Sequence, residues 1–226
     1  MRLPNSLGRA AIVALAGLWA ATAGHAEPNE EIAAAENLVR RTYYEGLPYA
    51  EARAVAPAAA ARWVAMLGDP RERAHAATIA EALGIAAPPG AFEALVAADA
   101  AGASGEIDLA AYKLRRAIPL AMGHLARSDD RALVWLIAAA EREGEDPGWY
   151  FRDRSGPRLG EEQRLRAVAG LGLAGRPAAA AALHRLSARH GPSGVSDHAR
   201  DALALNEGIA VRGADAVLGA PRRPRR

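Results

Sequence analysis

The sequence predicts an all-α protein, and three observations lead to this prediction. Alanine, the strongest helix former, makes up about a quarter of the 226 residues. Aromatic residues are only 5% of the chain, and no stretch alternates apolar and polar residues over the length of a strand, so a β-sandwich or barrel is not expected. Apolar residues instead recur at i, i+3, i+4 and i+7, the spacing of one buried helix face.

The first segment, residues 1–26, is typical of a secretory signal peptide. Arg2 and Arg9 give a positive start, an uncharged apolar run follows, and Gly24-His25-Ala26 places small residues before a cleavage site. The alternative is an uncleaved membrane anchor, but the uncharged run is shorter than the roughly 20 residues that a bilayer requires. We therefore expect cleavage after Ala26, a periplasmic or secreted location, and no stable membrane insertion after cleavage.

The charge balance argues against nucleic acid as a partner. Without Arg2 and Arg9, the 28 basic residues fall to the same number as the 26 acidic ones, so the mature chain has no net charge. Four of the remaining arginines lie at the end, within residues 219–226, which we expect to be a disordered basic tail. The body lacks the basic excess of a nucleic-acid-binding face.

The helices can be placed in order along the chain. Residues 27–45 form a first expected helix, with acidic residues early and arginines late, as the helix dipole favours. A second spans 49–67 and is broken near Pro57. Asp69 and Pro70 suit the N-cap and first position of the next helix.

Beyond this point five amphipathic stripes continue to the C-terminal part. Each contains apolar or small residues at helical spacing, so each predicts a helix with one buried face. The stripes are Ala76, Ile79, Ala80 and Leu83; Ile118, Ala121, Met122 and Leu125; Leu133, Leu136, Ile137 and Ala140; Leu165, Val168, Ala169 and Gly172; Ala179, Ala182, Leu183 and Leu186.

An internal repeat runs through these stripes. An apolar residue precedes a glycine three times, at Leu83–Gly84, Met122–Gly123 and Leu171–Gly172, and each pair is followed by a turn and a second helix. The glycines are 39 and 49 residues apart, and the longer step contains an extra segment at 144–160. A repeat of this period is typical of stacked helix pairs.

The three units resemble HEAT repeats, particularly the compact bacterial kind with an Ala-Leu-Gly signature. The resemblance covers about residues 69–189, with atypical flanking pairs at 27–67 and 196–218 that would act as caps. It implies an α-α superhelix, a HEAT-like α-solenoid of about four to five helix pairs over 27–218, with an extended surface used for binding. Pro119 departs from the pattern and should kink or shorten its helix.

The search for catalytic chemistry is negative. The chain has no cysteine, no Gly-x-Ser-x-Gly motif, no phosphate-binding loop and no His-Glu-x-x-His spacing. His190, Asp197 and His198 flank a glycine-rich loop and, with Asp201, are the best candidates for a metal site, but their spacing matches no known ligand pattern. We expect no catalytic residues, no bound metal and no cofactor.

The insert at 144–160 is the one feature that exceeds the repeat. It holds three consecutive aromatic residues among several arginines, a composition typical of binding hot spots. Its candidate partner-binding residues are Trp149, Tyr150, Phe151, Arg152 and Arg154. The alternative is that the rings fold back and seal the gap between two repeats.

Two classes of function follow. The favoured one is a non-enzymatic exported binding or scaffold module that mediates protein–protein interaction through its helical repeat surface, with an unidentified protein partner. The alternative is an exported α-helical enzyme whose site is assembled from scattered histidine and aspartate residues.

Overall fold

The computed structural model describes residues 28–44, 46–101, 104–154, 156–188 and 194–219. The expected signal peptide, residues 220–226 of the expected tail, and His190 of the candidate metal site lie outside these ranges. In the described part the protein is all-α apart from one two-residue strand pair, which confirms the predicted class. None of the described helices is long and apolar enough to cross a bilayer.

The helices follow one another in short steps. They are α1 (Pro28–Arg40), α2 (Tyr49–Ala54), α3 (Pro57–Leu67), the 3-10 helix η1 (Pro70–His75), α4 (Ala76–Ala86), α5 (Ala91–Ala100), α6 (Leu109–Leu125), α7 (Asp130–Glu141), α8 (Gly156–Ala174), α9 (Pro177–Ser187), α10 (Val195–Arg212) and α11 (Ala214–Leu218). The strands β1 (Gly105–Glu106) and β2 (Trp149–Tyr150) pair in parallel.

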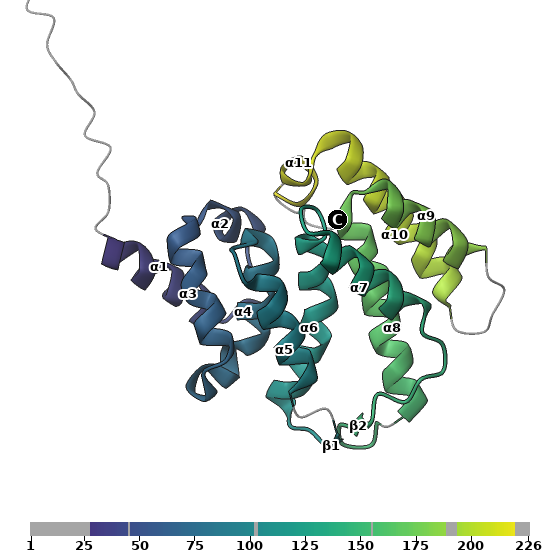
Figure 1. Cartoon of the computed structure of the whole chain (residues 1–226), viewed down its shortest axis with the longest axis horizontal. Coiled ribbons are helices and arrows are strands. Elements are labelled where there is room, and N and C mark those ends of the chain that lie inside the picture. Colours follow the sequence, from purple (N-terminus) through teal and green to yellow (C-terminus); the bar gives the residue numbers. More distant parts are fainter. Residues whose placement is uncertain (1–27, 45, 102–103, 155, 189–193, 220–226) are drawn as a thin grey trace, which may run out of the picture.

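Two rows of helices build the molecule (Figure 1). In one row α4 packs on α6, α6 on α8, and α8 on α10; in the other, α3 contacts α5 and α7 contacts α9. Ion pairs extend the second row, because Arg131 of α7 pairs with Glu93 of α5 and Arg176, just before α9, pairs with Asp130 of α7. The apolar core lies between the rows.

The glycines of the sequence signature lie where helices of the first row approach most closely. A Cβ on Gly84 would lie 2.3 Å from the Ala121 carbonyl oxygen, and a Cβ on Gly123 would lie 2.4 Å from that of Gly170. Gly172 faces Ala202 at 3.0 Å. Because only glycine lets the two backbones meet at this distance, the recurring glycine reflects helix packing.

Several expected boundaries were inexact. The first helix ends at Arg40, five residues early, while the break at Pro57 is confirmed, with α3 beginning at that residue. Asp69 does cap a helix, since its side chain accepts a hydrogen bond from the Arg71 amide at 2.9 Å, but this helix is η1 and α4 begins only at Ala76. α6 continues through Pro119 without being shortened there.

Candidate functional site

Backbone hydrogen bonds between residues that are far apart in the sequence hold the insert to the rest of the protein. The Gly105 amide donates to the Gly148 carbonyl at 3.0 Å, and the Ile107 amide donates to that of Tyr150 at 2.9 Å. Asp146 accepts a hydrogen bond from the Gly148 amide at 2.8 Å, which closes the turn before β2. The loop before α6 thus anchors the segment that precedes α8.

The strand geometry of the insert decides where its aromatic side chains point. Successive side chains of an extended segment face opposite sides. Trp149 and Phe151 are accordingly buried, whereas Tyr150 is 41% exposed. The tight turn that follows has Arg152 at a positive φ of 56° and is closed by hydrogen bonds between Phe151 and Arg154.

A small aromatic cluster forms beneath the insert. The Tyr112 ring of α6 stacks on Phe151 with centroids 4.4 Å apart and meets Trp149 edge-on at 6.4 Å. Its hydroxyl donates to Glu162 at 3.0 Å, and Arg154 donates both to that hydroxyl, at 3.1 Å, and to Glu162, at 3.0 Å. Trp149, Phe151 and Arg154 therefore connect the insert to α6 and α8.

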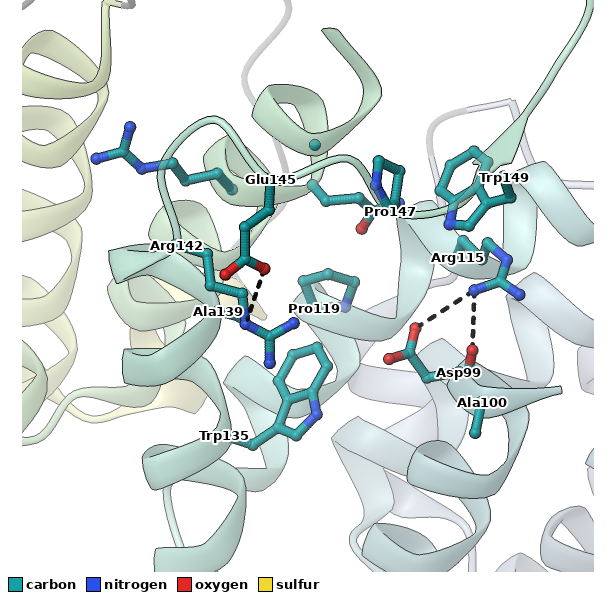
Figure 2. Close-up of a pocket in the computed structure, with 13 residues that line it drawn as sticks. Asp99, Ala100, Arg115, Pro119, Trp135, Ala139, Arg142, Glu145, Pro147 and Trp149 are labelled. Carbon is teal, nitrogen blue, oxygen red and sulfur yellow. Dashed lines mark hydrogen bonds and ion pairs between the residues drawn. The ribbon is translucent and has the colours of Figure 1, made fainter. Parts of the chain in front are cut away.

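Next to this cluster a pocket of about 250 Å³ opens between α6, α7, α8, the end of α5 and the insert. Figure 2 shows the rings of Trp135 and Trp149 on different sides of it, with Pro119 between them. Gly160 of α8 also lines the pocket, and a Cβ there would lie 1.9 Å from the Glu145 carbonyl oxygen. The first residues of the insert therefore pack directly on the backbone of α8 and form one wall of the pocket.

Two buried arginines fix the shape of the pocket. Arg115 donates to the carbonyl oxygens of Asp99 and Ala101, both at 2.8 Å, and its guanidinium lies 5.2 Å from the Trp149 ring centroid. Arg164 donates to the Ala140 carbonyl at 3.0 Å. Because both cap the last carbonyls of a helix, α5 or α7, they hold the walls in place.

The charged groups at the pocket differ in exposure. Burial raises the pKa of the Asp99 carboxyl, an effect that Arg115 and Arg142 oppose. Burial also lowers the pKa of Arg115. At the rim, Arg142 and Glu145 are exposed and form only a loose ion pair at 3.8 Å. The rim can thus exchange its internal ion pair for contacts with a ligand.

The pocket combines apolar walls with a few polar and charged side chains, a composition typical of ligand-binding pockets. Of the sequence-predicted contact residues, Trp149 lines the pocket and Phe151 is buried against Tyr112. Tyr150 and Arg152 are exposed on the surface of the insert. Sequence reasoning missed Trp135, which lies on α7 between the stripe residues Leu133 and Leu136 and carries no signal of its own.

The candidate metal residues are engaged locally. A His198 ring nitrogen lies 3.0 Å from the Gly194 carbonyl oxygen, and Asp197 forms an ion pair with Arg200. No group of three or more potential metal ligands comes together among the residues that the structure describes.

Comparison with known proteins adds no family. No protein-family model matches the chain, and no curated protein is significantly similar to it.

Proposed function

We propose that this chain is a non-enzymatic binding or scaffold module, exported to the periplasm or beyond, that binds a protein partner through a HEAT-like helical repeat surface. The observation that carries the proposal is the pocket between α6, α7, α8 and the insert. Its two tryptophan walls and its loosely paired rim suit an inserted side chain of a partner.

The glycine contacts support the repeat part of the proposal. Gly84 faces Ala121, Gly123 faces Gly170, and Gly172 faces Ala202. In each case the contacted residue lies two positions before the residue of the next helix that corresponds to the signature glycine. In α10 the equivalent site is Ala204, which is exposed, as a cap at the end of a stack would be. The register thus agrees with a short α-solenoid.

The enzyme alternative has less support. Of its candidate residues, Asp197 and His198 are occupied by contacts at the start of α10, and His190 lies outside the described residues. Among the ionisable groups at the pocket, Arg115 and Arg164 donate to the last carbonyls of helices, and Asp99 pairs with Arg115. These contacts favour a structural role for these three groups.

Peptide selection tests the proposal. We expect a random peptide library, displayed on phage and selected on the purified protein, to yield ligands that lose at least tenfold in affinity on Trp135→Ala, because truncating a central aromatic anchor typically costs about 2 kcal/mol or more. Arg142→Glu should weaken the same ligands by removing the exposed rim cation.

Val134→Ala is the matched control, since Val134 neighbours Trp135 on α7, is 67% exposed and does not line the pocket. Its affinity for the selected peptides should equal that of the wild type. Failure to enrich any peptide, or peptides that bind Trp135→Ala as tightly as wild type, would contradict the proposal. Tyr150→Ala then shows whether the exposed face of the insert contributes.

A further inference from the structure

Two further cavities lie where α2, in the N-terminal part of the chain, meets α11 near the C-terminal end of the described residues. Tyr49, at the start of α2, donates a hydrogen bond from its hydroxyl to Asp215 of α11 at 2.9 Å. Arg127, after α6, donates to the same hydroxyl at 2.7 Å. Figure 1 shows α2 and α11 next to each other beyond the ends of the first row of helices.

The two cavities adjoin. One of about 820 Å³ and one of about 600 Å³ are both lined by Tyr49, Ile85 and His124, so these residues mark the junction between them. We call the larger one the apolar groove and the smaller one the basic mouth. Their walls differ in character.

The basic mouth has uncompensated positive charge. Arg53 of α2, Arg127 and Arg212 of α10 line it, and Asp215 is the one acidic side chain among its lining residues. Elsewhere arginines such as Arg40 have carboxylate partners. Within the described residues, by contrast, none of these three forms an ion pair, and Arg53 and Arg212 have no hydrogen bond either.

A helix C-terminus accounts for each arginine taken singly. Arg53 and Arg212 lie in the last turns of α2 and α10, and Arg127 donates to the His124 carbonyl at the end of α6. Their convergence from three distant parts of the chain has a further consequence. Guanidinium groups around one cavity favour an anion with several oxygen atoms, because each can donate two parallel hydrogen bonds to it.

The apolar groove carries mostly aliphatic and aromatic walls. Its apolar lining includes Leu47, Ile85, Leu120, Leu173 and Leu218. Among its described lining residues the one carboxyl is that of Glu81, whose pKa is raised by partial burial, although the Leu47 amide donates a hydrogen bond that lowers it. A groove of this kind favours a hydrocarbon over a charged group.

The junction itself is uncharged but polar. His124 is only 8% exposed, and its pKa is lowered to about 3, first by burial and then by Arg127, so the ring is neutral near pH 7. Its Nδ1 atom is buried without a hydrogen-bond partner in the described structure. The Tyr49 ring lies 5.8 Å from it. An unsatisfied polar atom at the point where the cavities join is typical of a site that a ligand completes.

We propose that the apolar groove and the basic mouth together bind a single-chain anionic amphiphile, with its oxyanion head between Arg53, Arg127 and Arg212 and its hydrocarbon chain along the groove. The carboxylate of a fatty acid and the phosphate of a lysophospholipid share this chemistry. The chain's own C-terminal residues are a poorer occupant, because the four arginines after Gly219 carry the same charge as the mouth.

Calorimetric titration with defined amphiphiles below their micelle concentrations tests the proposal. Dodecanoate and dodecyl phosphate should bind. Dodecyltrimethylammonium and inorganic phosphate should bind at least tenfold more weakly, because the first lacks an anionic head and the second lacks a hydrocarbon tail. Along the series from decanoate to tetradecanoate, affinity should rise about fourfold per added methylene. Comparing the affinities of tetradecanoate and a myristoyl lysophosphatidic acid shows whether the site prefers the carboxylate of a fatty acid or the phosphate of a lysophospholipid.

Matched variants locate the site. Arg53→Ala and Arg212→Ala should each weaken dodecanoate binding about tenfold, and Leu218→Asp should weaken it at least as much. Arg200→Ala is the control, because Arg200 is on α10 but pairs with Asp197 and lines neither cavity.

Three results would overturn the proposal. The first is equal binding of the cationic and anionic dodecyl compounds, and the second is unchanged affinity in both arginine variants. The third is a severalfold gain in affinity on deletion of residues 220–226, which would mean that the chain itself fills the groove.

Discussion

Three consecutive aromatic residues in the insert illustrate how backbone conformation assigns roles to single side chains. Trp149 and Phe151 point inward because β2 is extended, and Tyr150 points outward for the same reason. The sequence shows the aromatic run but not the strand, since its partner β1 lies more than forty residues earlier. Of the two roles that sequence reasoning set as alternatives, inward packing is thus found for Trp149 and Phe151, while Tyr150 remains exposed and available for the proposed contact.

Truncation of Phe151 should separate these roles. Phe151→Ala removes a buried ring stacked on Tyr112 and should lower the free energy of unfolding by about 3 kcal/mol. Tyr150→Ala removes a half-exposed ring and should cost less than about 1 kcal/mol. Urea unfolding at 25 °C measures both. Equal losses in the two variants would show that the insert does not pack as described.

The buried His124 predicts a loss of stability in mild acid. The unfolded chain takes up a proton at this residue near pH 6.5, whereas the folded chain does so only near pH 3. Between these values the unfolded state binds more protons, so stability falls as the pH falls, by about 1.4 kcal/mol per unit from this group.

His124→Leu provides the comparison, because leucine has no titratable group. Between pH 6 and pH 4, measured by urea unfolding, this variant should lose about 2–3 kcal/mol less than wild type. Identical pH slopes for the two proteins would show that the ring is protonated, or exposed, in the folded state.

At the scale of helices, close backbone contact sets the packing of the first row. Gly84→Ala should destabilise the protein by about 2–4 kcal/mol although alanine is the better helix former, because the new methyl would overlap the Ala121 backbone. Thermal and urea unfolding measure the loss.

Gly208→Ala in α10 is the matched control. Its Cβ would closely approach only the Arg212 side chain, whose flexible end can move aside. We expect stability to be unchanged or raised by up to about 1 kcal/mol, the difference in helix propensity. A similar loss in both variants would mean that the loss at Gly84 does not come from overlap with the Ala121 backbone.

Helical periodicity was sufficient to predict the class and the part of the core that the five stripes cover. Ile79, Leu83, Ile118, Leu136 and Leu183 all came from the stripes, and all are buried. Where periodicity is absent, prediction was weaker: residues 70–75 form a 3-10 helix, and residues 41–44 and 46–48 form no helix. A short polar segment has no apolar face to identify it, so its conformation depends on tertiary contacts.

The candidate sites were harder to predict than the helices for a related reason. Trp149 stood out as one of three consecutive aromatic residues, whereas Trp135 and His124 each lie singly in a helix, next to residues of its apolar stripe. Arg53, Arg127 and Arg212 lie in separate helical units and come together only because α2 and α11 cover the same region. Local sequence carries no signal for such convergence.

At the scale of the whole molecule, the row of four helices divides into two halves that meet at α6 and α8. Gly123 and Gly170 form this central contact, and a methyl on Gly123 would lie 2.4 Å from the Gly170 carbonyl oxygen. The contacts of α4 with α6 and of α8 with α10 lie on either side and involve other residues. Outside the row, the Tyr49–Asp215 hydrogen bond also connects the two ends.

Gly123→Ala should therefore uncouple the halves rather than unfold one helix. In a stack held by contacts between neighbours, weakening a central contact reduces cooperativity because each half keeps its own internal contacts. Hydrogen exchange followed by mass spectrometry in increasing urea is the measurement. In wild type, and in Gly208→Ala as control, α3–α4 and α8–α10 should lose protection at the same urea concentration. In Gly123→Ala they should lose it at different concentrations, and a single coincident loss would mean that the Tyr49–Asp215 connection and the second row are enough to keep the halves together.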